Sequence, residues 1–268
     1  MTAKPATGAA EPGGTGWEDG IGRLVAARKL LVALDFDGTL APLVDNPEDS
    51  RPVPGARTAL ARLARVDRVQ LALVSGRPAA DLARLASPPD GTWLAGSHGA
   101  EQGRMSGAAA VLEPVELTAA QSRELDAIRA GLEDLAAAGP GAWIESKPLA
   151  AVFHTRPMAD RAAASHLEEQ AAGLGEALGG HVLAGKMVVE ISILPAGKAA
   201  ALTRLRHAAG ADRLVFAGDD TTDELALDTI HPPDLGIKVG PGATTAELRL
   251  PDPLAVAAFL HALADALV

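Results

Sequence analysis

The chain has 268 residues and a formal net charge of −10, with 34 acidic and 24 basic side chains. This balance argues against a general binder of nucleic acid or of anionic membranes. It contains no cysteine, which excludes disulfides and thiol chemistry. No apolar run approaches the roughly 18 residues of a membrane span, so we expect a cytoplasmic protein without a membrane partner.

The N-terminal segment, residues 1–25, is expected to form a disordered tail. It is rich in glycine, proline and alanine and has no apolar core. The absence of an apolar core also argues against a signal peptide.

Three apolar runs predict buried strands, at residues 30–34, 69–74 and 214–217. Polar residues follow each run: Asp35, Ser75 and Asp219. Apolar residues at helical spacing between the first two runs predict a helix over 55–65, and a second strand-helix-strand unit ends at the third run. This order predicts an α/β fold with a doubly wound parallel sheet.

The middle of the chain has another pattern. We predict helices over 118–138 and 159–178, the first with Leu125, Ile128, Leu132 and Leu135 on one face. Four strands are predicted, at 142–147, 150–155, 182–183 and 187–193. Such an order suits an antiparallel sheet with helices on one face. We therefore expect an inserted α+β cap domain over 103–193, within a core made of 26–102 and 194–268.

Two carboxylates, Asp35 and Asp37, follow the first predicted strand in the segment DFDGTL. Open α/β sheets bind ligands at the carboxyl ends of their strands. Such a pair can hold a hard cation through oxygen, or divide nucleophilic attack and proton transfer between its members. The alternative is a solvated turn after a strand.

DFDGTL resembles the first motif of the haloacid dehalogenase-like (HAD) phosphohydrolases. The resemblance implies that Asp35 is the nucleophile, that Asp37 transfers protons and that Thr39 orients Asp37 or the phosphate. It further implies a Mg²⁺ cofactor held by Asp35, Asp37 and Asp219.

The other motifs of the resemblance follow in the expected order. They are Ser75-Gly76-Arg77 for phosphate oxygens, Lys198 to neutralise Asp35 and phosphate, and Asp219 supported by Asp220 or Asp223. Each also has an ordinary interpretation: a strand-to-helix turn, a solvated lysine, or acidic residues at a helix N-terminus.

Further segments resemble the trehalose-6-phosphate phosphatases. They are residues 96–101, 145–148, 154–156 and 185–190, and the form GDDTTDE of the last motif. The chain departs from that family at Ser97 and at 194–197. The resemblance implies Mg²⁺-dependent hydrolysis of trehalose 6-phosphate through an aspartyl phosphate.

Strand alternation predicts that polar cap side chains share faces, because residues two or four apart on a strand point the same way. The pairs are Glu145 with Lys147, His154 with Arg156, and Lys186 with Glu190; Met187, Val189 and Ile191 are expected on the opposite face. With His98 and Glu101, the six paired residues are our candidates for sugar recognition. The alternative is a charged face exposed to water.

Several functions stay open at this stage. The chain could be another sugar-phosphate phosphatase, acting on sucrose phosphate or on a glucosyl- or mannosyl-glycerate phosphate. It could also be a phosphomannomutase or a non-catalytic sugar-phosphate sensor. The expected partner is a small sugar phosphate, with a monomeric protein and a trehalose-phosphate synthase as its pathway neighbour.

Overall fold

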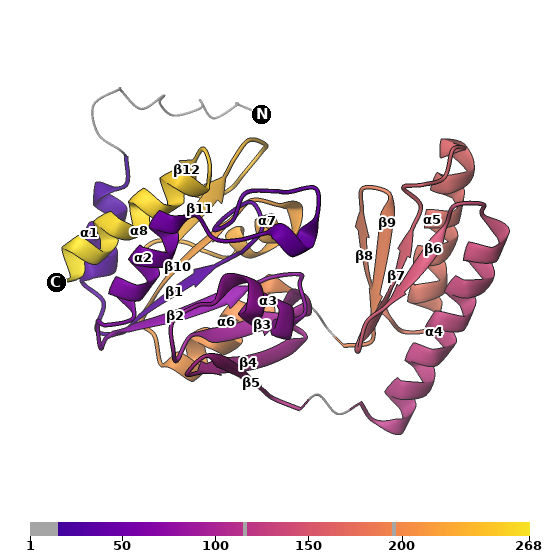
Figure 1. Ribbon diagram of the computed structural model, residues 1–268, viewed down its shortest axis with the longest axis horizontal. Coiled ribbons are helices and arrows are strands. Elements are labelled where there is room, and N and C mark those ends of the chain that lie inside the picture. The colour runs from indigo at the N-terminus through magenta and orange to yellow at the C-terminus, as the bar shows by residue number, and fades with distance from the viewer. Residues whose placement is uncertain (1–15, 115–116, 195–196) are drawn as a thin grey trace, which may run out of the picture. The chain divides into compact units, whose positions relative to one another are not determined.

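The computed structural model describes residues 16–114, 117–194 and 197–268. Its contacts divide the chain into two compact units, Met1–Glu113 with Gly197–Val268, and Pro114–Ala196. We call them the core unit and the cap unit; Figure 1 shows the elements of both.

An eight-stranded sheet organises the described part of the core unit, in the order β12-β11-β10-β1-β2-β3-β4-β5. The strands from β12 to β3 are parallel, and β4 and β5 add an antiparallel edge. Their bounds are β1 Leu30–Leu34, β2 Val69–Val74, β3 Trp93–Gly96, β4 Glu101–Ser106, β5 Ala109–Leu112, β10 Arg213–Gly218, β11 Leu235–Val239 and β12 Leu248–Leu250. The predicted α/β fold with a parallel sheet is confirmed.

Helices cover both faces of this sheet, as the side chains of β1 show. Leu30, Val32 and Leu34 pack into a cluster with α1, α2, α3 and α8, whereas Leu31 and Ala33 pack with α6 and α7. A strand buried on both faces is mostly apolar, which explains the uninterrupted run that predicted β1. The helices are α1 Glu18–Val25, α2 Pro54–Leu63, α3 Ala79–Ala86, α6 Lys198–Ala209, α7 Thr221–Leu227 and α8 Pro253–Leu267, with short 3₁₀ turns η1 Pro47–Asp49 and η2 Ser97–Gly99.

The cap unit is a four-stranded antiparallel sheet in the order β6-β7-β9-β8, with two helices on one face (Figure 1). The elements are α4 Ala119–Ala138, β6 Trp143–Ser146, β7 Ala150–His154, α5 Arg161–Ala177, β8 His181–Gly185 and β9 Val188–Ser192. Leu125 and Ile128 of α4 pack with Phe153 and Ile191 of the sheet. The opposite sheet face, which we call the open face, carries the polar side chains.

Two predicted boundaries differ from the structure. Residues 18–25 form α1 rather than part of a tail, because Ile21 and Leu24 are buried in the core. Residues 1–15 of the predicted tail lie outside the described residues. Residues 103–112, expected in the cap, belong to the core sheet because β4 pairs with β3 and β5 pairs with β4.

Candidate active site

The polar residues predicted at strand ends meet at the carboxyl edge of the core sheet. Asp35 follows β1, Ser75 follows β2 and Asp219 follows β10. Because β2 and β10 flank β1 on opposite sides, this edge is the point where the strand order reverses. Open α/β sheets bind their ligands at such a point.

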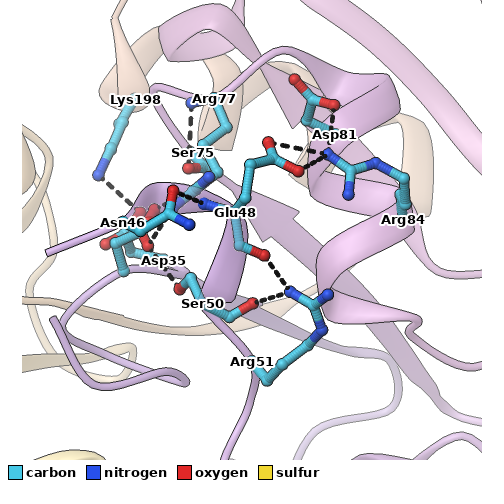
Figure 2. A network of polar contacts seen from close by, with 11 residues as sticks. Asp35, Asn46, Glu48, Ser50, Arg51, Ser75, Arg77, Asp81, Arg84 and Lys198 are labelled. Carbon is cyan, nitrogen blue, oxygen red and sulfur yellow. Dashed lines mark hydrogen bonds and ion pairs between the residues drawn. The ribbon is translucent and has the colours of Figure 1, made fainter. Parts of the chain in front are cut away.

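Lys198 is the cation at the centre of the site. It is the first residue of α6, and its side chain is 1% exposed. Its Nζ lies 2.9 Å from Asp35 Oδ1 and 2.7 Å from Asp223 Oδ1, and Figure 2 shows it pointing to Asp35. A buried ammonium between two carboxylates fixes the orientation of both.

The turn from β10 into α7 orients the acidic residues by reciprocal capping. Asp220 accepts a hydrogen bond from the Asp223 N–H at 2.8 Å. Asp223 Oδ2 accepts from the N–H groups of Asp219 and Asp220 at 3.0 and 3.1 Å. The predicted helix-capping role of this cluster and its place in the site are therefore compatible.

Gly38 allows the loop after β1 to approach Asp219 closely. Its φ is +79°, and a Cβ there would lie 2.1 Å from Asp219 Oδ2. Only glycine satisfies both the left-handed backbone and this contact. The Asp219 carboxylate therefore lies directly against the Asp37–Gly38 backbone.

The burial and close packing of these carboxylates shift their pKa values. Burial raises the pKa of Asp35 to about 7, although Lys198 opposes the shift. Burial, with repulsion from Asp223 and Asp220, raises the pKa of Asp219 to about 6. Burial opposes the shift of Asp220, but Lys198 and hydrogen bonds from Asp223 and Thr222 lower its pKa to about 2. Although burial acts against it, the carboxylates of Asp35 and Asp223 raise the pKa of Lys198.

Three carboxylates are close enough to share one metal ion. Asp35, Asp219 and Asp223 each offer an oxygen, and these oxygens lie within 4.8 Å of one another. An all-oxygen set suits a hard cation such as Mg²⁺. The raised pKa values of Asp35 and Asp219 also fit a cation site, because a bound cation favours the ionised carboxylates.

Asp37, a predicted metal ligand, is not in this group of three. Its Oδ2 accepts from Arg77 Nε at 2.5 Å, and its Oδ1 accepts from Arg77 Nη2 at 2.7 Å and from Ser50 Oγ at 2.8 Å. In the structure, the Asp37 side chain therefore forms an ion pair with Arg77. Asp223, and not Asp37, lies with Asp35 and Asp219 in the acidic cluster.

Ser50 is a site residue that the sequence analysis missed. It is fully buried and follows η1, whose Glu48 reaches Arg84 on α3 (Figure 2). A serine in a polar loop gives no distinctive pattern. Its position next to Asp37 arises only from the path of the folded loop.

Lys238 of β11 was also missed. Its buried Nζ donates to the Asp219 carbonyl oxygen at 2.6 Å and lies 2.9 Å from Glu224 Oε1. It therefore fixes the backbone that carries Asp219. The signal was present in the sequence: a single lysine in the apolar run LGIKV.

The remaining predicted core residues surround this centre. Ser75 Oγ accepts from the Arg77 N–H at 3.2 Å, and the His98 ring lies over Gly76, where a Cβ would be 2.7 Å from Nε2.

Glu101 accepts from Ser97 Oγ at 2.8 Å and from the Ala79 N–H at 2.7 Å. Both of its oxygens are thus used to brace the β3–β4 turn against α3. Thr39 is fully buried, and its Oγ1 has no hydrogen-bond partner among the described residues.

The open face of the cap unit carries four of the six predicted cap residues. Lys147 Nζ lies 2.7 Å from Glu190 Oε2, and His154 Nε2 lies 3.2 Å from Glu145 Oε2. Val189 and Ile191 are on the helix-covered face, as predicted.

The alternation argument fails at three cap residues. Arg156 follows the end of β7, and Lys186 and Met187 form the turn between β8 and β9, where Met187 has a φ of +63°. None of them lies in a strand, so strand alternation does not place their side chains on either face.

No helix within 16–114, 117–194 and 197–268 combines the length and the apolar character needed to cross a bilayer.

The doubly wound sheet, the acidic pair after its central strand and the inserted α+β unit define a HAD-like fold. The trehalose-phosphatase family model matches residues 33–251, and the chain belongs to this family. It is 36% identical over 276 residues to a trehalose-phosphate phosphatase of Mycobacterium avium, with 94% of this chain and 66% of that protein covered.

Two further proteins are similar to the chain. An uncharacterized glycosyl hydrolase of Mycobacterium tuberculosis is 35% identical over 260 residues, which are 90% of this chain and 19% of that protein. The solved C-terminal domain of Candida albicans trehalose-6-phosphate phosphatase is 23% identical with a TM-score of 0.73, covering 92% of this chain and 96% of that one. The chain thus spans two thirds or less of the length of these two mycobacterial relatives.

Proposed function

We propose that the chain hydrolyses trehalose 6-phosphate to trehalose and phosphate, with Asp35 as the nucleophile. The observation that carries the proposal is the position of Asp35: buried at the carboxyl end of the central strand, bound to Lys198 and adjacent to Asp219. Binding alone needs no such nucleophile, which argues against a sensor. Family membership and the names of the relatives support the trehalose substrate.

The proposed reaction has two steps that share one proton-transfer group. Asp35 attacks phosphorus, the bond to the sugar oxygen breaks, and Asp37 protonates that oxygen. Water then attacks the aspartyl phosphate and gives a proton to Asp37, which frees Asp35 and releases phosphate. Asp37 follows Asp35 by two residues in the sequence, and Arg77 and Ser50 fix the position of its carboxylate, which supports the proposal.

Lys198 and the strand-end groups have roles in charge and orientation. Lys198 keeps Asp35 in place and offers positive charge beside the phosphate. Ser75, Gly76 and Arg77 offer donors to phosphate oxygens at the end of β2. Asp35 and Asp219, with Asp223 nearby, would hold Mg²⁺, whose charge would offset that of the phosphate.

The open face of the cap unit is the proposed sugar-recognition surface. Glu145, Lys147, His154 and Glu190 present both donors and acceptors, which suit the hydroxyls of a sugar. A second candidate function, hydrolysis of another sugar phosphate, shares the same core chemistry. The cytoplasmic location, the monomeric state and the pathway relation to a trehalose-phosphate synthase stay predictions from the sequence.

The test is phosphate release from a substrate panel. Trehalose 6-phosphate, glucose 6-phosphate and sucrose 6-phosphate are compared with Mg²⁺ present, using wild type and Asp35→Asn. We expect the highest kcat/KM for trehalose 6-phosphate and loss of turnover in the variant. Preference for another member of the panel would overturn the substrate assignment and leave the phosphatase chemistry standing.

A further inference from the structure

Trp143, at the start of β6, is an unusual residue of the cap unit. It is 47% exposed and is the one exposed large apolar side chain among the described cap residues, 114, 117–194. Leucine, valine and isoleucine side chains of this unit are buried or partly covered instead. Single exposed apolar side chains are common on protein surfaces, so the groups that surround Trp143 decide what it can do.

A neighbouring ring covers one side of the Trp143 indole. The His154 imidazole is stacked on it, with ring centroids 4.0 Å apart and planes 9° apart. The imidazole is itself hydrogen-bonded to Glu145 at 3.2 Å. One indole face is therefore packed against a fixed partner, while the residue as a whole stays 47% exposed. The result is a flat apolar surface that is ordered before any ligand arrives.

This surface lies beside the polar groups of the open face. Trp143 and Glu145 are two residues apart on β6, a separation of roughly 7 Å along the strand. Glu145 pairs across to Val152, which pairs across to Glu190, so the two carboxylates share one row of the sheet. Lys147 extends this row by its ion pair with Glu190. A polar row and an aromatic surface are thus adjacent on the open face.

We propose that Trp143 is the contact for the sugar ring that carries no phosphate. Each hexose ring has a rim of hydroxyl groups and a face of C–H groups, so it needs both hydrogen-bonding partners and an apolar surface. The row of Glu145, Lys147 and Glu190 supplies the first, and Trp143 supplies the second. The inference rests on the proposed function and deepens it: Trp143 makes the site prefer a disaccharide phosphate to a monosaccharide phosphate.

The kinetic test compares substrates with two rings and with one. For Trp143→Ala we expect kcat/KM for trehalose 6-phosphate to fall about tenfold, mostly through KM. The value for glucose 6-phosphate, which lacks the second ring, should stay within twofold. Trp143→Phe keeps a flat apolar face and should retain most of the disaccharide activity. Equal losses on both substrates, or no loss on either, would overturn the proposal.

A binding measurement gives a readout independent of turnover. The chain has three tryptophans, and Trp17 and Trp93 belong to the core unit. Trp17→Phe with Trp93→Phe leaves Trp143 as the single emitter, and Asp35→Asn in this background prevents turnover. We expect trehalose 6-phosphate to change the Trp143 emission saturably. Unchanged emission while binding is detected by calorimetry would place the sugar elsewhere and overturn the proposal.

The two hypotheses fail in different ways. If wild type hydrolyses another sugar phosphate instead, the proposed function is wrong, and the comparison is repeated with the one-ring and two-ring phosphates that it does hydrolyse. A Trp143→Ala loss confined to two-ring substrates still supports the subsite. If wild type hydrolyses trehalose 6-phosphate and Trp143→Ala does so equally well, only the further inference is wrong.

Discussion

Arg77 binds both carboxylate oxygens of Asp37, through Nε at 2.5 Å and Nη2 at 2.7 Å. The guanidinium also lies over the Phe36 ring, 5.5 Å from its centroid. Hydrogen bonding to Asp37 raises the pKa of Arg77, so the guanidinium keeps its positive charge. Asp37, the residue proposed to transfer protons, is therefore held in place by the planar guanidinium of Arg77.

Replacement of Arg77 by lysine should be costly despite the retained charge. A lysine cannot reproduce the two parallel hydrogen bonds, so Asp37 loses its orientation. We expect kcat/KM to fall tenfold or more with little change in Tm. Arg84→Lys is the matched control, since Arg84 is half-exposed and pairs with Asp81 and Glu48 at the surface. A folded Arg77→Lys enzyme with wild-type kinetics would refute this role.

Ser50 should act as a positioning residue for Asp37. Ser50→Ala removes one hydrogen bond worth about 1 kcal/mol, so we expect kcat to fall about fivefold with a smaller effect on KM. Ser50→Thr retains the hydroxyl and should recover part of the loss. Asn46→Ala loosens the same loop, because Asn46 caps η1, but it does not touch Asp37. Equal effects of Ser50→Ala and Asn46→Ala would assign the loss to the loop as a whole.

The metal-free protein should lose stability as pH rises from 3.8 to about 7. The folded-state pKa of Asp35 is about 7 against 3.8 in the reference state, so the folded protein holds a proton that the unfolded chain releases. This contribution is complete below pH 3.8 and is lost as pH rises through 7. The free energy of unfolding should fall by up to roughly 1.4 kcal/mol per pH unit in that window.

Chemical denaturation after EDTA treatment and desalting measures this slope. Asp35→Asn should reduce the slope, because an amide does not titrate, whereas Asp219 still contributes to it. Mg²⁺ should raise Tm more at pH 7.5 than at pH 5, because protons compete with the cation at low pH. The same EDTA treatment should abolish turnover, and Mg²⁺ should restore it. Full activity of the metal-free protein would contradict the assignment of a metal site.

Glu190→Ala should affect the sugar substrate rather than the phosphoryl-transfer chemistry. Glu190 binds Lys147 on the open face of the cap unit, so its removal disturbs the proposed sugar contacts. We expect a steep fall in kcat/KM for trehalose 6-phosphate and little change for p-nitrophenyl phosphate. Glu169→Ala, an exposed change on α5, controls for the loss of a surface charge. Proportional losses on both substrates would point to a structural role for Glu190.

The parts of the fold that the sequence predicted are those set by local pattern. The apolar runs of β1 and β2 match their strands residue for residue, because strands buried on both faces read as nearly continuous apolar runs. Helix α4 also begins where predicted, since Thr118 caps it. Helix α1 was missed because its two buried residues follow a glycine- and proline-rich stretch and are recognised only by what they pack against.

The residues of the candidate site also divide into those that local pattern predicts and those that depend on the folded structure. Asp35, Lys198 and Asp219 were found because strand ends and helix starts are visible in a sequence, and parallel strands bring them together. Ser50 and the Arg77–Asp37 pair depend on side-chain directions in loops, which no periodicity records. Arg156 and Lys186 were misplaced because strand alternation was extended to them, although β7 ends at His154 and β9 begins only at Val188.

The central claim is that Asp35 receives the phosphoryl group, and chemical trapping tests it most directly. Borohydride reduces an aspartyl phosphate to homoserine, so acid-quenched turnover mixtures are reduced, digested and sequenced by mass spectrometry. We predict homoserine at position 35 in the presence of Mg²⁺ and trehalose 6-phosphate, and none when substrate is omitted or in Asp35→Asn. Homoserine at another aspartate, or active enzyme that never yields it at position 35, would contradict the account.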